Sequence, residues 1–102
     1  MTIQELAEQI EKVSQKYVSV YHIERNKDWY ILKLQEELGE LIQAYLMFEG
    51  QGRSKGKTKS EMKDDLDKEV ADVFCHLLLL AKNYNVNLEK AIQDKWLKWN
   101  EV

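Results

Sequence analysis

Carboxylates that lie within the apolar stripe of a predicted helix constrain this chain more than any other feature. At about 100° per residue, six apolar side chains fall on one line: Tyr30, Leu34, Leu38, Leu41, Tyr45 and Phe48. Glu37 falls at the edge of this stripe, Glu40 lies one turn further along, and Glu36 flanks both. Burying an ionised carboxylate is costly unless a partner neutralises its charge. The fold must therefore supply such a partner.

A second segment repeats this pattern. Its predicted inner stripe consists of Met62, Leu66, Val73, Leu77, Leu80 and Tyr84. Glu69 lies inside the stripe, and Asp65 and Asp72 lie at its margin. His76 follows one turn later on the same face. The two segments therefore predict two helices with acidic residues on the faces that pack together.

The acidic residues of the two helices predict a divalent metal site. In an antiparallel pair, four carboxylates would lie within a few ångströms: Glu37, Glu40, Glu69 and Asp72. Two carboxylates about 5 Å apart repel by roughly 3 kcal/mol at an effective dielectric constant of about 20. Oxygen ligands of this kind suit Mg²⁺ or Mn²⁺. Zinc prefers Cys or His ligands, and only His76 is available. A di-iron site would require Glu-x-x-His pairs, which the spacing does not provide.

Capping signals predict an all-α chain of four helices, and the sequence contains no proline to interrupt them. The predicted helices begin at the capping box Thr2–Glu5, at Asp28, at the capping box Thr58–Glu61 and at Asn87. The second is expected to end near Glu49, the third near Tyr84, and the fourth to continue through Trp99. In the first helix, Ile3, Leu6, Ala7, Ile10, Val13 and Tyr17 predict the packed face, and Glu5, Glu8, Glu11 and Lys12 the solvent face.

Length and charge limit the classes of function. A chain of 102 residues with a net charge of −3 predicts one domain, residues 1–102, and argues against a nucleic-acid partner. The longest apolar run, 73–81, is interrupted by His76 and is too short to cross a membrane. With one cysteine and no apolar leader, a cytoplasmic location is expected. The third helix is also apolar on its far side, through Phe74, Cys75, Leu78 and Leu79, which predicts a homodimer or homotetramer.

Several residues outside the acidic pairs have two interpretations. The glycine-rich stretch 50–59 is either a solvated, mobile linker or a flap whose basic residues, Arg53, Lys55, Lys57 or Lys59, contact a polyphosphate. Trp29 either anchors the connection before the second helix or stacks on a base. Trp96 and Trp99 either close the core or form a subunit interface, and Lys95 or Lys98 could contact a phosphate. Lys33 and His76 complete the candidate substrate-binding residues.

The acidic pairs also resemble a family signature. Glu36-Glu37-Leu38-Gly39-Glu40, followed after 28 residues by Glu69-Val70-Ala71-Asp72, is similar to the EExxE…ExxD pattern of the MazG-like all-α nucleoside triphosphate pyrophosphohydrolases. The resemblance implies a four-helix MazG-like bundle completed by oligomerisation. It also implies that Glu37, Glu40, Glu69 and Asp72 are Mg²⁺ ligands and that Glu36 is the catalytic group near the attacking water.

The activity implied by the resemblance is hydrolysis of the bond between the α- and β-phosphates of a nucleoside triphosphate, often in nucleotide-pool cleaning. The products would be the monophosphate and pyrophosphate. Two alternatives stay open at this point. One is an enzyme similar to phosphoribosyl-ATP pyrophosphohydrolase, and the other is a non-enzymatic helical interaction module with a structural divalent-ion site.

Overall fold

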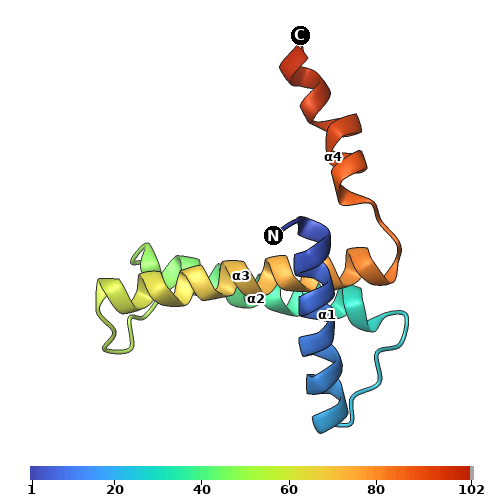
Figure 1. Ribbon diagram of the computed structural model, residues 1–102. Helices are drawn as coiled ribbons and strands as arrows, with labels where there is room; N and C mark the ends of the chain where they lie inside the picture. The colour runs from blue at the N-terminus through green and yellow to red at the C-terminus, as the bar shows by residue number, and fades with distance from the viewer. Residues whose placement is uncertain (102) are drawn as a thin grey trace.

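The computed structural model describes residues 1–101 and is all-α over that range, as predicted. The elements are α1 (Ile3–Val20), α2 (Trp29–Phe48), α3 (Lys59–Asn83), α4 (Leu88–Lys95) and a terminal 3₁₀ helix, η1 (Leu97–Glu101). Figure 1 shows α2 and α3 side by side as an antiparallel hairpin, which α1 crosses on the α3 side. α4 projects away from the hairpin (Figure 1). None of the described helices is long and apolar enough to span a membrane.

Three of the four predicted N-caps are confirmed. Thr2 and Thr58 form complete capping boxes with Glu5 and Glu61, and the side chain of Asn87 accepts a hydrogen bond from the Lys90 amide. Asp28 does occupy the N-cap position of α2, but its side chain, unlike the other three, makes no capping hydrogen bond. The cap is instead the carboxamide of Asn26, whose Oδ1 accepts hydrogen bonds from the amides of Asp28 and Trp29 at 3.1 and 3.0 Å.

The predicted length of the last helix is also wrong. α4 ends at Lys95, and the chain continues as η1 instead of remaining α-helical through Trp99. Trp96 and Trp99 are 70% and 65% exposed, so they do not close the core of this chain. With no surface to pack against, this segment lacks the tertiary contacts that stabilise most protein helices. The alternative role of Trp96 and Trp99 at a subunit interface stays a prediction.

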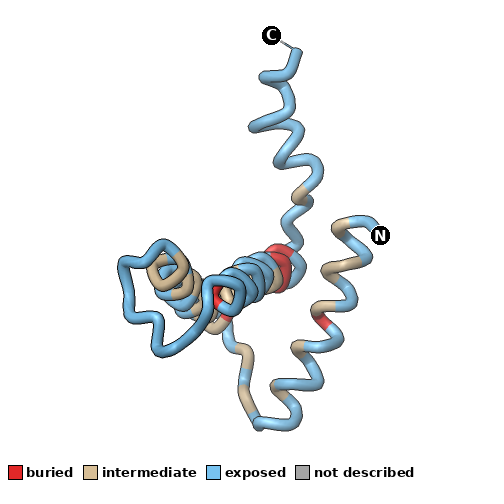
Figure 2. The backbone as a smooth tube through the Cα atoms, turned by 90° about the vertical axis from the view of Figure 1, so that its left-hand side faces the viewer, coloured by how far each residue is buried: buried red, intermediate tan, exposed pale blue. Residues whose placement is uncertain are grey.

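The core is small, and most of it lies where α1 crosses the hairpin, whereas Met62 lies near the opposite end of α3. The buried apolar residues are Tyr30, Met62, Leu78, Leu79 and Ala81, and Figure 2 shows how few positions of the chain are buried. Leu78 and Leu79 belong to the far side of α3, which the sequence predicted would be left for another subunit. Both are buried within the single chain, where α1 packs against α3. The outer turns of α1 are not covered, since Val13 and Tyr17 are 63% and 51% exposed.

The packed face of α2 is rotated relative to the prediction. Leu38 and Tyr45, which were expected in the inner stripe, are 46% and 50% exposed. Glu37, which was predicted between Leu34 and Leu41 at the edge of the stripe, is partly buried, as are Leu34 and Leu41. On α3, Leu77 and Tyr84 are likewise exposed. The interior of the hairpin therefore contains Glu37 where the pattern had placed Leu38.

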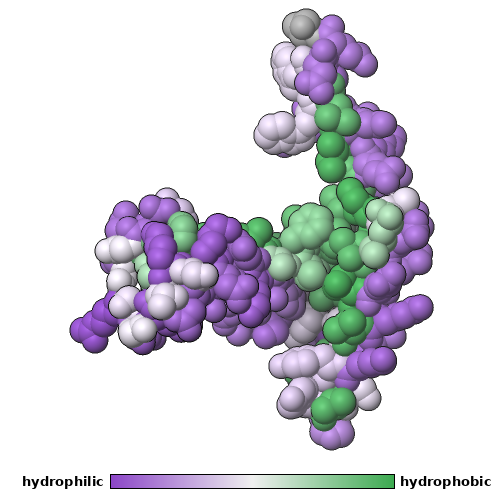
Figure 3. Space-filling model, turned by 60° about the vertical axis from the view of Figure 1, so that its left-hand side comes forward, coloured by the Kyte–Doolittle hydropathy of each residue, from purple (hydrophilic) through white to green (hydrophobic). Residues whose placement is uncertain are grey.

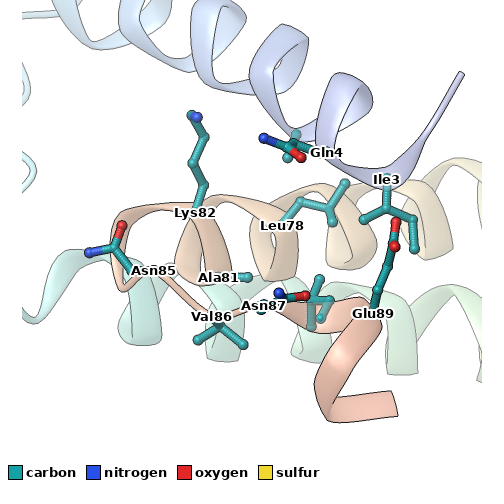
Figure 4. A pocket seen from close by; sticks show the side chains of 11 residues that line it. Ile3, Gln4, Leu78, Ala81, Lys82, Asn85, Val86, Asn87 and Glu89 are labelled. Carbon is teal, nitrogen blue, oxygen red and sulfur yellow. The ribbon is translucent and has the colours of Figure 1, made fainter. Parts of the chain in front are cut away.

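A groove of about 400 Å³ lies between the first turns of α1, the end of α3 and the start of α4. Figure 4 shows Ile3 and Gln4 on one side and Leu78, Val86 and Asn87 on the other. No acidic residue of the two signature pairs lines this groove. The groove is therefore separate from the site described next.

Candidate metal centre

Three carboxylates converge between the paired helices. One oxygen each of Glu37, Glu40 and Glu69 lies within 4.8 Å of the others. Glu37 and Glu40 are three residues apart on α2 and therefore share a face. Glu69 approaches them from the antiparallel α3. These three residues form the acidic cluster.

Two oxygens of the acidic cluster lack any partner. Glu37 Oε2 and Glu69 Oε2 are buried and accept no hydrogen bond. The Glu37 side chain is only 12% exposed. A buried acceptor without a partner costs about 1–3 kcal/mol, and more if it is charged. Because the unpaired atoms are carboxylate oxygens in a converging group, the residues fit a hard divalent cation such as Mg²⁺ or Mn²⁺.

The electrostatics of the cluster disfavour full ionisation of these groups without a cation. Burial is the largest effect and, together with the charges of Glu40 and Asp72, raises the pKa of Glu37 to about 7. Burial and the neighbouring Asp72 also raise the pKa of Glu69. A divalent cation would oppose both shifts, since opposite charge favours the ionised carboxylate.

The other two signature acids lie at the rim. Asp72 is exposed and falls outside the group of oxygens that lie within 4.8 Å of one another, although its charge affects the pKa of Glu37 and Glu69. Its role as a ligand stays a prediction. Glu36 is also exposed, and its Oε2 lies 3.4 Å from Lys33 Nζ. Glu36 therefore faces solvent beside the cluster and is not buried within it.

Three of the predicted substrate-binding residues lie beside the acidic cluster. His76 Nε2 is 3.8 Å from Glu37 Oε1, and the ring centroids of His76 and Trp29 are 6.1 Å apart. The charge of Lys33 partly opposes the burial that raises the pKa of Glu37, and it adds to the larger effect of burial in lowering the pKa of His76. Trp29, Lys33 and His76 therefore form an aromatic and basic wall next to the carboxylates.

The remaining predicted substrate-binding residues lie elsewhere in the chain. Arg53 and Lys55 are exposed in the connection between α2 and α3, and the end of α2 is about 12 Å beyond Glu40 at 1.5 Å per residue. Lys95 lies on α4, which projects away from the hairpin (Figure 1). Two basic residues of the connection have local partners. Lys57 pairs with Asp65 at 2.5 Å, and Lys59 donates to the Phe48 carbonyl.

The sequence interpretation missed a buried ion pair. Glu11 was predicted on the solvent face of α1, but it is 7% exposed and pairs with Arg25. The sequence did contain a signal. Ala7, Glu11 and Ser14 are spaced by four and three residues and therefore continue the packed face of α1.

Comparison with known protein families identifies the domain. The family model of the MazG nucleotide pyrophosphohydrolase domain matches residues 25–102. No curated protein and no solved structure matches the chain. The matched range contains the acidic cluster, its aromatic and basic wall, and Arg25.

Proposed function

Because the chain belongs to the MazG nucleotide pyrophosphohydrolase family, we propose that it is a Mg²⁺-dependent nucleoside triphosphate pyrophosphohydrolase. It cleaves the bond between the α- and β-phosphates of an NTP or dNTP, and it releases pyrophosphate and the monophosphate. The observation that carries this proposal is the acidic cluster with its two unpartnered buried oxygens.

Carboxylates from both α2 and α3 hold the cation. Glu37 and Glu69 present buried oxygens, and Glu40 completes the cluster from the exposed side. Asp72 acts as a fourth ligand from one turn after Glu69. When bound, Mg²⁺ or Mn²⁺ supplies charge neutralisation at the phosphate oxygens and a water molecule of lowered pKa.

Glu36 orients the attacking water. Its carboxylate is exposed beside the cluster, where it can accept a proton from a water at the rim. Lys33, which lies 3.4 Å from Glu36, is placed to meet a phosphate oxygen. These roles use the two side chains that border the cluster on the solvent side of α2.

Trp29 and His76 bind the nucleoside part of the substrate. Both have ring systems beside the cluster, and stacking on an aromatic ring is worth about 1–3 kcal/mol per base. Arg53 and Lys55 contact the substrate only if the connection 49–58 folds over the site or a second copy of the chain brings them to it. Lys95 lies on α4 and requires the second copy.

Residues 1–102 work as a single domain in a homodimer or homotetramer. Large apolar side chains are exposed along α2 and α3: Ile31, Leu38, Ile42, Tyr45, Val70, Phe74 and Leu77. Figure 3 shows further hydrophobic side chains in a band along α1 that continues toward α4. Association of copies would cover these surfaces and complete the four-helix bundle.

A pyrophosphate-release assay with a panel of nucleotides and Mg²⁺ tests the proposal. Release from one or more NTPs or dNTPs, with formation of the monophosphate, is the expected result. Release from phosphoribosyl-ATP alone would favour the related pyrophosphohydrolase. Failure with every nucleotide, together with retained Mg²⁺ binding, would favour the non-enzymatic module.

A further inference from the structure

The buried ion pair between Glu11 and Arg25 joins three parts of the fold. Arg25 Nη1 lies 2.6 Å from Glu11 Oε1 and donates to Glu11 Oε2 at 3.0 Å. The same nitrogen donates to Ser14 Oγ at 3.2 Å. Asn83 Nδ2, at the end of α3, donates to Glu11 Oε1 at 3.3 Å. The pair therefore links α1, the connection before α2, and α3.

Stability alone does not account for a charged pair at this position. Glu11, at 7% exposed, is the one charged residue that is buried in the described part of the chain, and the Arg25 side chain is 15% exposed. Replacing a buried ion pair with apolar side chains of similar volume is often neutral or stabilising. An apolar contact would serve to pack α1 on α3, so a further reason for the guanidinium is needed.

The guanidinium of Arg25 lies against the aromatic residues that begin α2. Its Cζ is 5.4 Å from the ring centroid of Tyr30 and 6.0 Å from that of Trp29. The two rings pack edge to face, with centroids 5.2 Å apart. Trp29 in turn lies 6.1 Å from His76, which borders the acidic cluster. A continuous series of contacts thus leads from the ion pair to the wall of the site.

We propose that Arg25, oriented by Glu11, is a positioning residue that fixes the indole of Trp29 beside the acidic cluster and thereby sets the affinity for the nucleoside part of the substrate. The planar guanidinium can stack on an aromatic face while its nitrogens bond the carboxylate, which neither lysine nor an apolar side chain can reproduce. The nucleotide part of this inference rests on the proposed function.

The test separates positioning from simple stabilisation by using three variants. Arg25→Met leaves Glu11 buried without its partner and should lower the melting temperature. The double variant Glu11→Leu/Arg25→Met should recover the melting temperature, since both charges are removed. If Arg25 positions Trp29, KM of the double variant stays at least about fivefold above the wild-type value, with kcat little changed. Arg25→Lys keeps the charge, but its KM should likewise stay above the wild-type value.

An exposed ion pair provides the matched control. Lys90 and Asp94 on α4 are paired at 2.5 Å and are 70% and 63% exposed. The double variant Lys90→Met/Asp94→Leu should leave KM and kcat at their wild-type values. Recovery of both stability and KM in Glu11→Leu/Arg25→Met would overturn the proposal and leave the pair as a structural contact.

A second readout does not depend on catalysis. In the background Trp96→Phe/Trp99→Phe, Trp29 is the single tryptophan. Its fluorescence anisotropy should fall, and its quenching by acrylamide should rise, when Glu11→Leu/Arg25→Met is added. Unchanged fluorescence would overturn the positioning role, whether or not the protein hydrolyses nucleotides. If fluorescence changes but no nucleotide is hydrolysed, the proposed function fails and the nucleotide part of the inference fails with it.

Discussion

His76 Nε2 lies 3.8 Å from Glu37 Oε1, and the side chains of His76 and Glu37 are only 20% and 12% exposed. Burial is the largest effect on both groups, and it disfavours the charged form of each. It raises the pKa of Glu37 to about 7 and lowers the pKa of His76. Near neutral pH the two side chains therefore do not form a full ion pair. The charge of the site should consequently change with pH and with added cations.

The raised pKa of Glu37 predicts that the metal-free protein loses stability as the pH rises. The folded state binds the Glu37 proton more tightly than the unfolded state, so stability falls between about pH 4.5 and about pH 7. A shift of this size is worth up to about 3 kcal/mol. The lowered pKa of His76 acts in the opposite sense below about pH 6.5.

Urea unfolding in EDTA at several pH values measures this dependence. Comparing wild type with Glu37→Gln isolates the contribution of Glu37, because the amide does not titrate. The wild-type protein should lose more stability than the variant from pH 5 to pH 8. Parallel curves for the two proteins would mean that the Glu37 carboxyl is not perturbed.

The basic connection predicts a salt-dependent contribution to substrate affinity. Lys57 and Lys59 already have partners within the chain. The variant that tests the connection is therefore Arg53→Ser/Lys55→Ser. It should raise KM severalfold at low ionic strength and less at about 0.15 M salt, where screening is stronger. Exposed lysines on α3 supply the control Lys63→Ser/Lys68→Ser. Equal KM values for wild type and Arg53→Ser/Lys55→Ser would leave the connection as a linker.

The exposed apolar faces of α2 and α3 predict an oligomer at micromolar concentration. Sedimentation should give a mass at least twice the 12.1 kDa of one chain. Ile42→Glu/Phe74→Glu should lower the mass, since each substitution places a charge on an exposed apolar face. Lys63→Glu provides a charge change outside these faces. A wild-type species of 12 kDa would contradict the prediction.

Local signals predicted most of the fold. The two capping boxes, the Asn87 cap and the bounds of α2 and α3 depend on neighbouring residues, so the sequence contains the information directly. The side of α2 that faces α3 depends on tertiary packing, and Leu38 was therefore predicted in the inner stripe although it is 46% exposed. The same reason explains Glu11, because its burial requires Arg25 and Asn83 from distant segments.

The candidate site was predictable to a similar extent. Helical spacing brought Glu37 and Glu40 to one face, and the antiparallel connection brought Glu69 to them. The sequence could not indicate that Glu37 Oε2 and Glu69 Oε2 would be without partners. The sequence also could not indicate that Trp29 and His76 lie beside the cluster and that Lys95 does not. These distinctions depend on how α2 packs against α3 and on where α4 lies, and short-range patterns do not encode that.

The most direct test of the central claim compares the Mg²⁺ response of wild type with that of Glu69→Gln. Without metal, the variant should be as stable as wild type or more stable, because one charge of a mutually repelling cluster is removed. Its pyrophosphate release should collapse. Glu8→Gln makes the same chemical change at an exposed position of α1 and serves as the control.

Paired melting curves with EDTA and with saturating Mg²⁺ decide the matter. Ligand at about 100 times its dissociation constant stabilises a folded protein by about 2.7 kcal/mol. Wild type and Glu8→Gln should therefore melt at higher temperature with Mg²⁺, and Glu69→Gln should respond much less. Equal Mg²⁺ responses in all three proteins, with pyrophosphate release retained in Glu69→Gln, would contradict both the metal site and the mechanism built on it.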